Sequence, residues 1–323
     1  MYIVTGCAGF IGFHFSKFLI NRKMRIIGID NLNSYYSKNY KLDRIKILNK
    51  SKYFKFYKID LNNKNKISLI FEKNKITKVI HFAAQPGVIY SYKNPESYKK
   101  NNVNATKNLV QIINKNNIKK FIFCSSSSVY GDHKKYPIKE NFKLKPMNYY
   151  AKTKVECENI IRKKLNNSKC STSIIRPFTV YGPFGRPDML LLKIMTSLTF
   201  QKKINIYNYG EHFRDFTYID DVVDIVFKIS KILNNKINLF NVCASDPLKI
   251  NNVINLIKKN EKKKIQLNYL KKRKGEMHIT FGSNLKLIKF IKKHKFTKFD
   301  IGYKKTSSWF KKYKNKRYLR LPN

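Results

Sequence analysis

A tyrosine and a lysine stand four residues apart at Tyr150 and Lys154, and a run of four serines, Ser125–Ser128, precedes them in the chain. On a helix, residues four apart lie on one face, and a lysine ammonium favours the ionised form of a neighbouring phenol. Following a serine-bearing strand, such a pair favours a catalytic role. Tyr149 is less suited to this role, because the residue four places after it is an uncharged threonine. Surface residues can share this spacing by chance, so the elements that carry the pair decide its meaning.

Six short apolar runs, rich in β-branched and aromatic residues, alternate with longer segments of helical period. The runs are Tyr2–Val4, Arg25–Ile29, Tyr53–Ile59, Lys78–Ala83, Lys120–Cys124 and Ser173–Arg176. The helical segments between them are Ile11–Lys23, Lys64–Lys73, Pro95–Asn116 and Tyr150–Leu165. Strands that alternate with helices form a parallel sheet covered on both faces. The sequence therefore predicts an α/β fold with a doubly wound parallel sheet of the Rossmann type over residues 1–177.

Beyond Pro177 the chain is punctuated by proline and glycine, which predicts a smaller, C-terminal substrate-binding lobe over residues 178–323. Its expected elements are a helix at Met189–Leu198, a strand at Ile204–Tyr207, a loop at Gly210–Asp215, a helix at Ile219–Lys231 and a strand at Leu239–Val242. We expect the chain to return to the first domain near residues 219–243.

A glycine-rich turn joins the first predicted strand to the first predicted helix. Gly6, Gly9 and Gly12 follow the pattern Gly-x-x-Gly-x-x-Gly. The first glycine allows the tight turn, the second lets the backbone approach a pyrophosphate, and the third lets the helix pack close to the strand. The start of the helix, at Phe10 and Ile11, directs free N–H groups at phosphate charge. At the beginning of a strand–helix–strand unit, this pattern predicts a dinucleotide site.

Asp30 closes the second predicted strand, 18 residues after Gly12. A carboxylate at that place accepts both hydroxyls of an adenosine ribose and repels a 2′-phosphate, which favours NAD over NADP. Parallel sheets bind ligands at the carboxyl ends of their strands. The further cofactor contacts expected there are Asn31, Asp60, Leu61, Ala83, Ala84 and Gln85.

The chain of 323 residues is strongly basic, with 68 Lys and Arg against 19 Asp and Glu and a formal net charge of +49. Such a charge is typical of proteins that bind nucleic acid or an anionic membrane surface. The lysines are dispersed and accompanied by many Asn and Ile, however, so a biased genome composition is the simpler explanation. Because no arginine-rich block and no zinc-ligand spacing is present, we expect neither a specific nucleic-acid partner nor a metal.

The five cysteines are odd in number and scattered, which predicts reduced thiols. The sequence shows neither a secretory signal pattern nor an apolar run of the ~18 residues that suggest a membrane-spanning helix. We therefore expect a cytoplasmic protein without membrane insertion.

Together these motifs resemble the extended short-chain dehydrogenase/reductase family of nucleotide-sugar epimerases and dehydratases, and within it the UDP-glucuronate 4-epimerases. The matching stretches are Thr5–His14, Gly28–Tyr36, His81–Gln85, Ser125–Gly131, Tyr150–Lys154, Thr179–Met189 and Tyr207–Asp221. Beyond residue 245 the sequence diverges, with Arg273–Glu276 as the best-matched segment.

The resemblance implies a mechanism for Tyr150, Lys154 and Ser126. Tyr150 would act as the base on the sugar 4-hydroxyl while C4 gives a hydride to NAD, and Ser126 would hydrogen-bond the same oxygen. Lys154 would hold the nicotinamide ribose. The 4-keto sugar would turn over before the hydride returns to its opposite face. Family 4,6-dehydratases carry an acidic pair where this chain has Ser127 and Ser128, which argues against dehydration.

The resemblance also implies three groups of substrate contacts. They are Ser127, Ser128 and Thr179 at a glucuronate carboxylate, Arg186 and Arg214 at the nucleotide diphosphate, and Arg273 and Glu276 at the uridine ribose. A planar, permanently charged guanidinium suits phosphate. One departure from the family bears on the sugar, because Ile89 stands where the family usually has an arginine.

We therefore expect a nucleotide-sugar 4-epimerase with tightly bound NAD and a UDP-sugar substrate, with conversion of UDP-glucuronate to UDP-galacturonate as the favoured reaction. By analogy with the family, a homodimer would form through the helices near residues 95–116 and 150–165. Two alternatives stay open. The first is a 4-epimerase for a neutral or N-acetylated UDP-hexose, and the second is a polyanion-binding protein on the same fold.

Overall fold

The central sheet contains seven strands, and every neighbouring pair is parallel. The strands are β1 (Tyr2–Thr5), β2 (Ile26–Asp30), β3 (Phe54–Lys58), β4 (Lys78–His81), β5 (Lys120–Cys124), β6 (Ser171–Pro177) and β10 (Ile237–Val242). Their order across the sheet is β10-β6-β5-β4-β1-β2-β3. The structure is a computed structural model that describes residues 1–234, 236–313 and 315–319.

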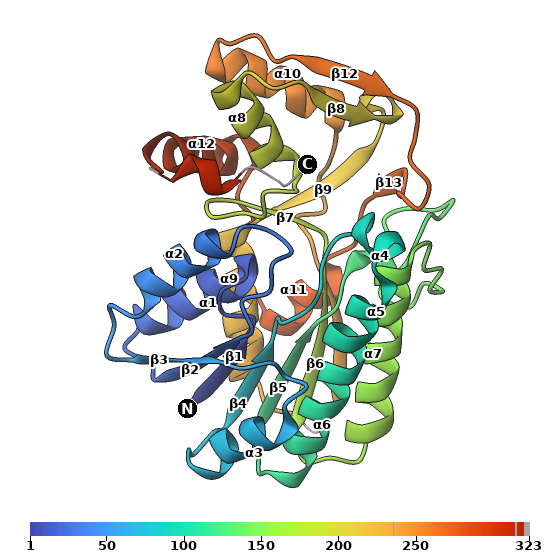
Figure 1. The fold of residues 1–323 in the computed structure, drawn as a ribbon. Coiled ribbons are helices and arrows are strands. Elements are labelled where there is room, and N and C mark those ends of the chain that lie inside the picture. Colours follow the sequence, from blue (N-terminus) through green and yellow to red (C-terminus); the bar gives the residue numbers. More distant parts are fainter. Residues whose placement is uncertain (235, 314, 320–323) are drawn as a thin grey trace.

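Helices cover both faces of this sheet (Figure 1). One face carries α1 (Phe10–Ile20), α2 (Lys38–Leu48), α9 (Ile219–Lys231) and α11 (Leu285–Ile291), and the other carries α3 (Lys64–Glu72), α6 (Ala105–Lys115) and α7 (Tyr149–Leu165). Side chains alternate between the two cores, because successive residues of a strand point to opposite faces. Ile3 packs with residues of α3, α6 and α7, whereas Val4 packs with residues of α1 and α9. The predicted doubly wound fold is confirmed.

The strand order reverses beside β1. The chain adds β2 and β3 on one side of β1 and then crosses to the other side, where β4, β5 and β6 follow. In doubly wound sheets, such a reversal leaves a crevice at the carboxyl ends of the strands, where ligands bind.

The helix expected at Pro95–Asn116 is divided into three segments. It consists of α5 (Pro95–Tyr98), a π-helical stretch at Lys99–Asn104 and α6, and the short helix α4 (Tyr90–Lys93) precedes it. The π-helical stretch contains Asn102, whose buried side-chain amide accepts a hydrogen bond from Gln85 N at 2.7 Å and donates to the Thr153 hydroxyl at 3.0 Å. Local π-helical turns are frequent at functional sites, and this one joins the end of β4 to α7 through Asn102.

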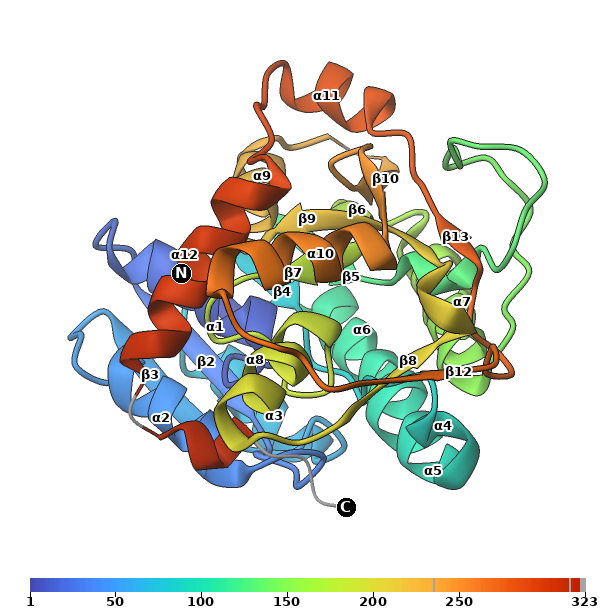
Figure 2. The same cartoon turned by 90° about the horizontal axis from the view of Figure 1, so that it is seen from above.

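A smaller lobe lies over the carboxyl end of the sheet (Figures 1 and 2). Its strands are β7 (Thr179–Tyr181), β9 (Phe213–Tyr218), β11 (Pro247–Lys249) and β13 (Ile279–Thr280), with a separate parallel pair of β8 (Ile204–Tyr207) and β12 (Leu267–Leu270). Its helices are α8 (Leu190–Phe200), α10 (Ile250–Glu261) and α12 (Phe299–Lys312), with short 3₁₀ turns at Asn208–Gly210 and Lys316–Leu319. A further 3₁₀ turn, Ser127–Val129, follows β5 in the first domain. Between these segments the chain returns to the large sheet, where β10 pairs with β6 and α9 packs beside α1.

The loop expected at Gly210–Asp215 is wrong in its second half. Strand β9 already begins at Phe213. Its partners are β7, β11 and β13, which come from distant parts of the chain. Pairing between distant strands leaves no local pattern in the sequence, so the polar residues of this segment predict a loop.

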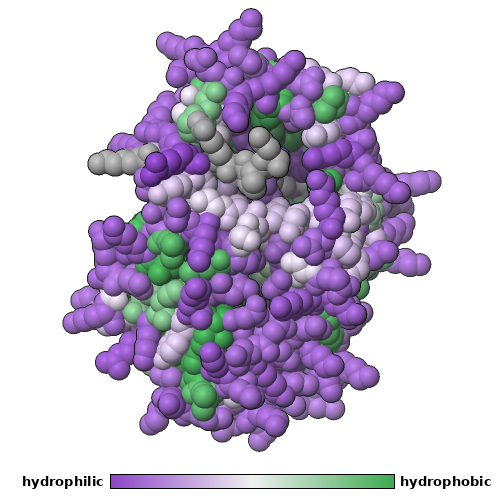
Figure 3. All heavy atoms as spheres, in the orientation of Figure 1, coloured by the Kyte–Doolittle hydropathy of each residue, from purple (hydrophilic) through white to green (hydrophobic). Residues whose placement is uncertain are grey.

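Hydrophilic residues cover most of the face seen in Figure 3, and hydrophobic ones form only small patches on it. The five cysteines are unpaired, and four of them are buried. No helix among the described residues combines the length and the apolar character that crossing a bilayer requires.

Candidate active site

A cavity of about 990 Å³ opens between the carboxyl end of the sheet and the smaller lobe. All but one of the site residues expected from the sequence line it. They are Gly6, Gly9, Phe10, Ile11, Gly12, Asp30, Asn31, Asp60, Leu61, Ala83, Ala84, Ser126, Ser127, Ser128, Tyr150, Lys154, Thr179, Arg186, Arg214, Arg273 and Glu276. The exception is Gln85, which is 2% exposed and bonded by Asn102 through its main chain. The structure thus gathers segments that are up to 270 residues apart in the chain.

The glycine-rich loop is packed too closely for larger residues. Gly6 has φ +72°, and a Cβ atom there would lie 2.6 Å from the Ala83 nitrogen. A Cβ atom on Gly12 would lie 2.1 Å from the Gly6 carbonyl oxygen. Gly9 is the N-cap of α1 and lines the cavity, so the free N–H groups of the helix start face the ligand space. The loop therefore forms a cradle for an anionic group at the end of a helix.

Asp30 stands at the end of β2 and belongs to the same cradle. Its carboxylate accepts hydrogen bonds from Ala8 N at 3.1 Å and from Leu32 N at 2.8 Å. Each carboxylate oxygen has a second lone pair, so both can still accept ribose hydroxyls. Asp60, at the end of β3, accepts from the Asn31 amide at 3.0 Å. Burial alone would raise the pKa of Asp60, but hydrogen bonds from Asn62 and Asn31 hold it below its usual value.

The N-terminus of α7 positions Tyr150 and Lys154. Asn148 caps this helix, because its side-chain oxygen accepts from Ala151 N at 2.9 Å. Lys154 is 3% exposed, and its ammonium donates to the Cys124 carbonyl at 2.8 Å, at the end of β5. Both Tyr150 and Lys154 line the cavity, in agreement with the choice of Tyr150 over its neighbouring tyrosine.

The cap also joins α7 to the smaller lobe, since the Asn148 amide donates to the Gly275 carbonyl at 3.2 Å. We expect Asn148→Ala to lower the free energy of unfolding by about 1 kcal/mol and to raise the KM for the substrate several-fold. The matched control is Asn63→Ala, which removes the cap of α3 at a residue that does not line the cavity. Urea unfolding and steady-state kinetics of both variants measure this, and equal KM values for the two would contradict the expectation.

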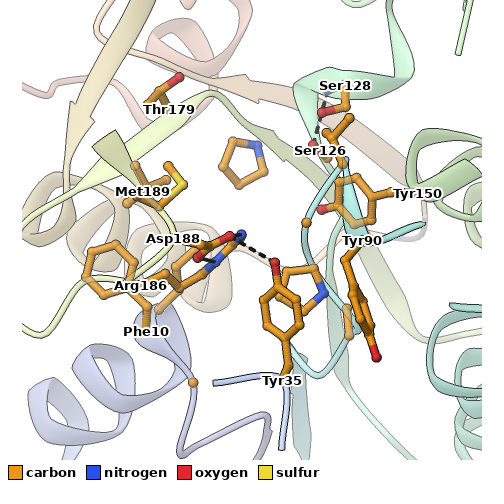
Figure 4. A pocket seen from close by; sticks show the side chains of 18 of the residues that line it. Phe10, Tyr35, Tyr90, Ser126, Ser128, Tyr150, Thr179, Arg186, Asp188 and Met189 are labelled. Atoms are coloured by element: carbon orange, nitrogen blue, oxygen red, sulfur yellow. Dashed lines mark hydrogen bonds and ion pairs between the residues drawn. The ribbon is translucent and has the colours of Figure 1, made fainter. Parts of the chain in front are cut away.

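The serine run forms a short 3₁₀ turn at the end of β5. Ser126 caps this turn by accepting from Ser128 N at 3.1 Å, so its own O–H remains available to a ligand. Behind the turn, Ser125 donates to the Glu158 carboxylate at 2.6 Å, and Glu158 forms a buried ion pair with Arg176. These contacts hold the turn against α7 and β6. In Figure 4, Ser126, Ser128 and Tyr150 lie together on one side of the cavity.

Arg186 lies on the opposite side of the cavity, together with Asp188 (Figure 4). The Arg186 guanidinium donates two hydrogen bonds to the Asp188 carboxylate, which also accepts from the Tyr35 hydroxyl at 3.0 Å. Burial alone would lower the pKa of Arg186, but the Asp188 carboxylate outweighs it and raises that pKa above the usual range. Arg186 is therefore a fixed and permanently charged donor at the cavity wall.

Three further cations of the smaller lobe line the cavity. Arg214 donates to the main-chain carbonyls of Phe213 and His278, and burial lowers its pKa. The Arg273 guanidinium lies 3.7 Å from the Tyr207 ring centroid and pairs with Glu276. Lys193 on α8 is the third, and burial lowers its pKa too.

Together with Arg186, these side chains give the smaller lobe's side of the cavity four cations, against the two carboxylates of Asp188 and Glu276. The excess of positive charge suits a ligand that carries a diphosphate.

Several residues of the cavity were missed from the sequence. They are Tyr35, Lys41, Asp188, Lys193, Tyr207 and His212. A lysine gives no signal in a chain this rich in lysine. Asp188 could have been found, because it lies two residues after Arg186 within a matched stretch.

NAD fits the part of the cavity built by the first domain. The close-packed glycine loop leaves room for a pyrophosphate, Asp30 offers carboxylate oxygens to a ribose, and Lys154 keeps free ammonium hydrogens beside Tyr150. The substrate would then occupy the space between Ser126 and the cations of the smaller lobe (Figure 4).

Comparison with known proteins gives the same assignment. The sequence model of the NAD dependent epimerase/dehydratase family matches residues 2–243. A UDP-glucuronate 4-epimerase of Thermodesulfobacterium geofontis is 35% identical over 96% of both chains, and protein CapI of Staphylococcus aureus is 32% identical over 97% of this chain and 99% of its own. The crystal structure of UDP-glucuronic acid 4-epimerase from Bacillus cereus with UDP-glucuronic acid and NAD matches with a TM-score of 0.91 and 30% identity, over 96% of this chain and 99% of that one.

Fold and site together define an enzyme of the extended short-chain dehydrogenase/reductase class. Within that class the chain belongs to the NAD-dependent epimerase/dehydratase family. NAD is its cofactor.

Proposed function

We propose that the protein is a nucleotide-sugar 4-epimerase that interconverts UDP-glucuronate and UDP-galacturonate with NAD that stays bound. The observation that carries the proposal is one cavity that joins a dinucleotide cradle, the Tyr150–Lys154 pair and a cluster of cations. The likeness to UDP-glucuronate 4-epimerases over nearly the whole chain supports the choice of sugar.

The protein's own residues supply proton transfer and orientation. Tyr150 accepts the proton of the sugar 4-hydroxyl and returns it after the 4-keto sugar has turned over, and Ser126 hydrogen-bonds the same oxygen. Lys154 places positive charge one helical turn beyond Tyr150 and offers hydrogens to the nicotinamide ribose. When bound, NAD supplies the redox chemistry by taking a hydride from C4 and giving it back to the other face.

The nucleotide and the sugar carboxylate have separate contacts in this proposal. Arg186 and Arg214 hold the diphosphate, and Arg273 and Glu276 hold the uridine ribose. The carboxylate meets hydroxyl donors at Ser127, Ser128 and Thr179, which line one end of the cavity. With hydroxyls in place of an acidic pair, the site lacks the groups that would remove water from the sugar.

The test of the proposal is NMR of the purified protein incubated with UDP-glucuronate, first without and then with added NAD. We expect UDP-galacturonate in both cases. No product in either case would contradict the proposed function.

The substrate class is tested by a panel with UDP-glucose and UDP-N-acetylglucosamine. The alternative gains support from Ile89, which lines the cavity as an apolar residue, and from a TM-score of 0.87 to UDP-N-acetylglucosamine 4-epimerase from Methanobrevibacter ruminantium. We expect kcat/KM for UDP-glucuronate to exceed that for the neutral sugars at least about tenfold, the effect of one charge-assisted contact. Equal or faster turnover of UDP-glucose would overturn the glucuronate assignment.

We also propose that the protein is a cytoplasmic homodimer. Helices α6 and α7 pack side by side on the outside of the sheet, where a second copy has access (Figure 1). The unpaired cysteines agree with a reducing compartment. Sedimentation equilibrium is expected to give twice the chain mass of 38.3 kDa, and a monomer at micromolar concentration would contradict the dimer.

A further inference from the structure

Arg44 on α2 is a fully buried cation without a carboxylate partner. Its exposed fraction is 0%, and none of the ion pairs formed among the described residues involves it. Two rings face the charge, with the guanidinium carbon 4.2 Å from the Tyr40 ring centroid and 5.6 Å from that of Tyr36. Burial of an unpaired ion costs several kcal/mol, so a packing role alone does not account for an arginine here.

The guanidinium reaches two segments that belong to different halves of the site. Nη1 donates to the Ala8 carbonyl and to the Tyr36 hydroxyl, both at 2.7 Å. Nη2 donates to the carbonyls of Phe184 at 2.7 Å and Gly185 at 3.2 Å. Ala8 lies inside the glycine-rich loop, whereas Phe184 and Gly185 form the turn after β7. One rigid, planar fork therefore ties the cofactor loop to the substrate lobe.

Other donors of the first domain hold the same turn. The His14 ring on α1 bonds the Pro183 carbonyl at 2.7 Å, and the Tyr40 hydroxyl donates to Gly185 at 3.1 Å. Burial lowers the pKa of His14 to about 3, so at neutral pH the ring is uncharged and its Nε2–H is the donor. Phe184 has φ +52°, which is uncommon for a residue other than glycine. Three successive carbonyls are thus fixed to α1 and α2, with the backbone of the turn held in one conformation.

The turn leads directly into Arg186 and Asp188 at the cavity wall. We propose that Arg44 is a positioning residue, which sets the place of Arg186 relative to the glycine-rich loop and so aligns the sugar nucleotide with NAD. Its uncompensated charge beside that loop also attracts the pyrophosphate of NAD. The inference rests on the proposed function, because Arg44 would align a sugar-nucleotide site with an NAD site.

Arg44→Lys separates the charge of this residue from its shape. A single ammonium nitrogen on a shorter side chain does not reproduce the two fixed donor nitrogens of the guanidinium, although it keeps the positive charge. We expect NAD content to stay within about twofold of the wild type and kcat/KM to fall on the order of 100-fold, because a misplacement of about 1 Å can cost that much. Arg44→Met removes the charge as well and is expected to lower the NAD content of the purified protein. Assay of the cofactor released on denaturation measures this without turnover.

A double-mutant cycle tests whether Arg44 acts through Arg186. In the Arg186→Ala background the group to be positioned is gone, so Arg44→Lys should cost less than about threefold in kcat/KM there. The same loss of about 100-fold in both backgrounds would overturn the proposal, because it would show that the two residues act independently.

Two milder variants control for effects on folding. Arg22→Lys changes an exposed arginine over the Phe18 ring and is expected to leave all values unchanged. Tyr40→Phe removes one hydrogen bond to Gly185 and keeps the cation, so we expect kcat/KM to fall about threefold with unchanged NAD content. If Arg44→Lys and Tyr40→Phe both melt earlier but turn over like the wild type per folded molecule, the role is structural and the proposal fails. An inactive wild type would instead refute the proposed function. The NAD content of Arg44→Met would then show whether Arg44 contributes to NAD binding at the glycine-rich loop.

Discussion

Tyr150→Phe is expected to lower kcat by about 10³-fold while the purified protein still contains NAD. Proton transfer by a positioned side chain contributes roughly 10²–10⁴-fold, and a hydride cannot leave C4 readily while the hydroxyl keeps its proton. The substitution retains the ring, whose centroid lies 6.1 Å from that of Tyr98, so the cavity keeps its shape. Rates are measured by NMR of product formation, and NAD by release from the denatured protein.

The neighbouring tyrosine provides a matched control for this variant. Tyr149 is the first residue of α7 and does not line the cavity. Tyr149→Phe should therefore retain at least about half of the wild-type kcat, as most surface substitutions do. Comparable losses in the two variants, or a fully active Tyr150→Phe, would show that Tyr150 is not the base.

Gly12→Ala is expected to abolish tight NAD binding and to lower the free energy of unfolding by about 2 kcal/mol, the usual cost of overpacking. The added Cβ would lie 2.1 Å from the Gly6 carbonyl oxygen and 3.1 Å from the Cys7 Cα, both of which are backbone atoms. The helix start must therefore move away from β1, and the loop loses the shape that receives the pyrophosphate. Urea unfolding and NAD content after purification measure the two effects.

Gly9→Ala distinguishes contact with the cofactor from packing of the loop. Its Cβ would come within 3.0 Å of the Gly6 carbonyl oxygen and otherwise face the cavity. We expect a nearly unchanged free energy of unfolding together with weaker NAD binding. If Gly12→Ala and Gly9→Ala both retained NAD like the wild type, the loop would not be the pyrophosphate site.

The sequence predicts those parts of the fold whose pattern lies within a few consecutive residues. Strands β1 and β5 and the start of α7 have an apolar or helical period of their own, and the glycine pattern lies within seven residues. Because a doubly wound sheet brings its strand ends to one edge, these local motifs also predict which residues meet in the cavity. Asp30 and Tyr150 line the same cavity although 120 positions separate them.

Elements held by distant contacts were not predictable in the same way. Helix α2 has no clear apolar face, and its buried residues pack on aromatic rings from the loop after β2 and from the C-terminal part of the chain. Strand β9 depends on three partners that lie far away in sequence. Gln85 does not line the cavity, because it is buried and its main-chain N–H donates to Asn102 of the π-helical stretch, a distant contact of the same kind.

The rarity of arginine is a signal that could have been used further. Only ten residues of this lysine-rich chain are arginine, and five of them are Arg44, Arg176, Arg186, Arg214 and Arg273. Each of these five bonds carbonyls, a carboxylate or an aromatic ring at or beside the cavity, where a lysine could not reproduce the fork. In a chain whose composition favours lysine, each of these arginines therefore indicates a position where the shape of the guanidinium matters more than its charge.

Transfer of deuterium within the sugar shows whether the C4 hydride passes through bound NAD. UDP-glucuronate with deuterium at C4 is incubated with the protein in ordinary water, and the UDP-galacturonate formed is analysed by NMR and mass spectrometry. Because bound NAD would take the hydride from C4 and return it to the same carbon, we expect product that keeps its deuterium at C4. Product with hydrogen from water at C4 would rule out this mechanism, since that hydrogen would have come from solvent and not from the cofactor held by this cavity.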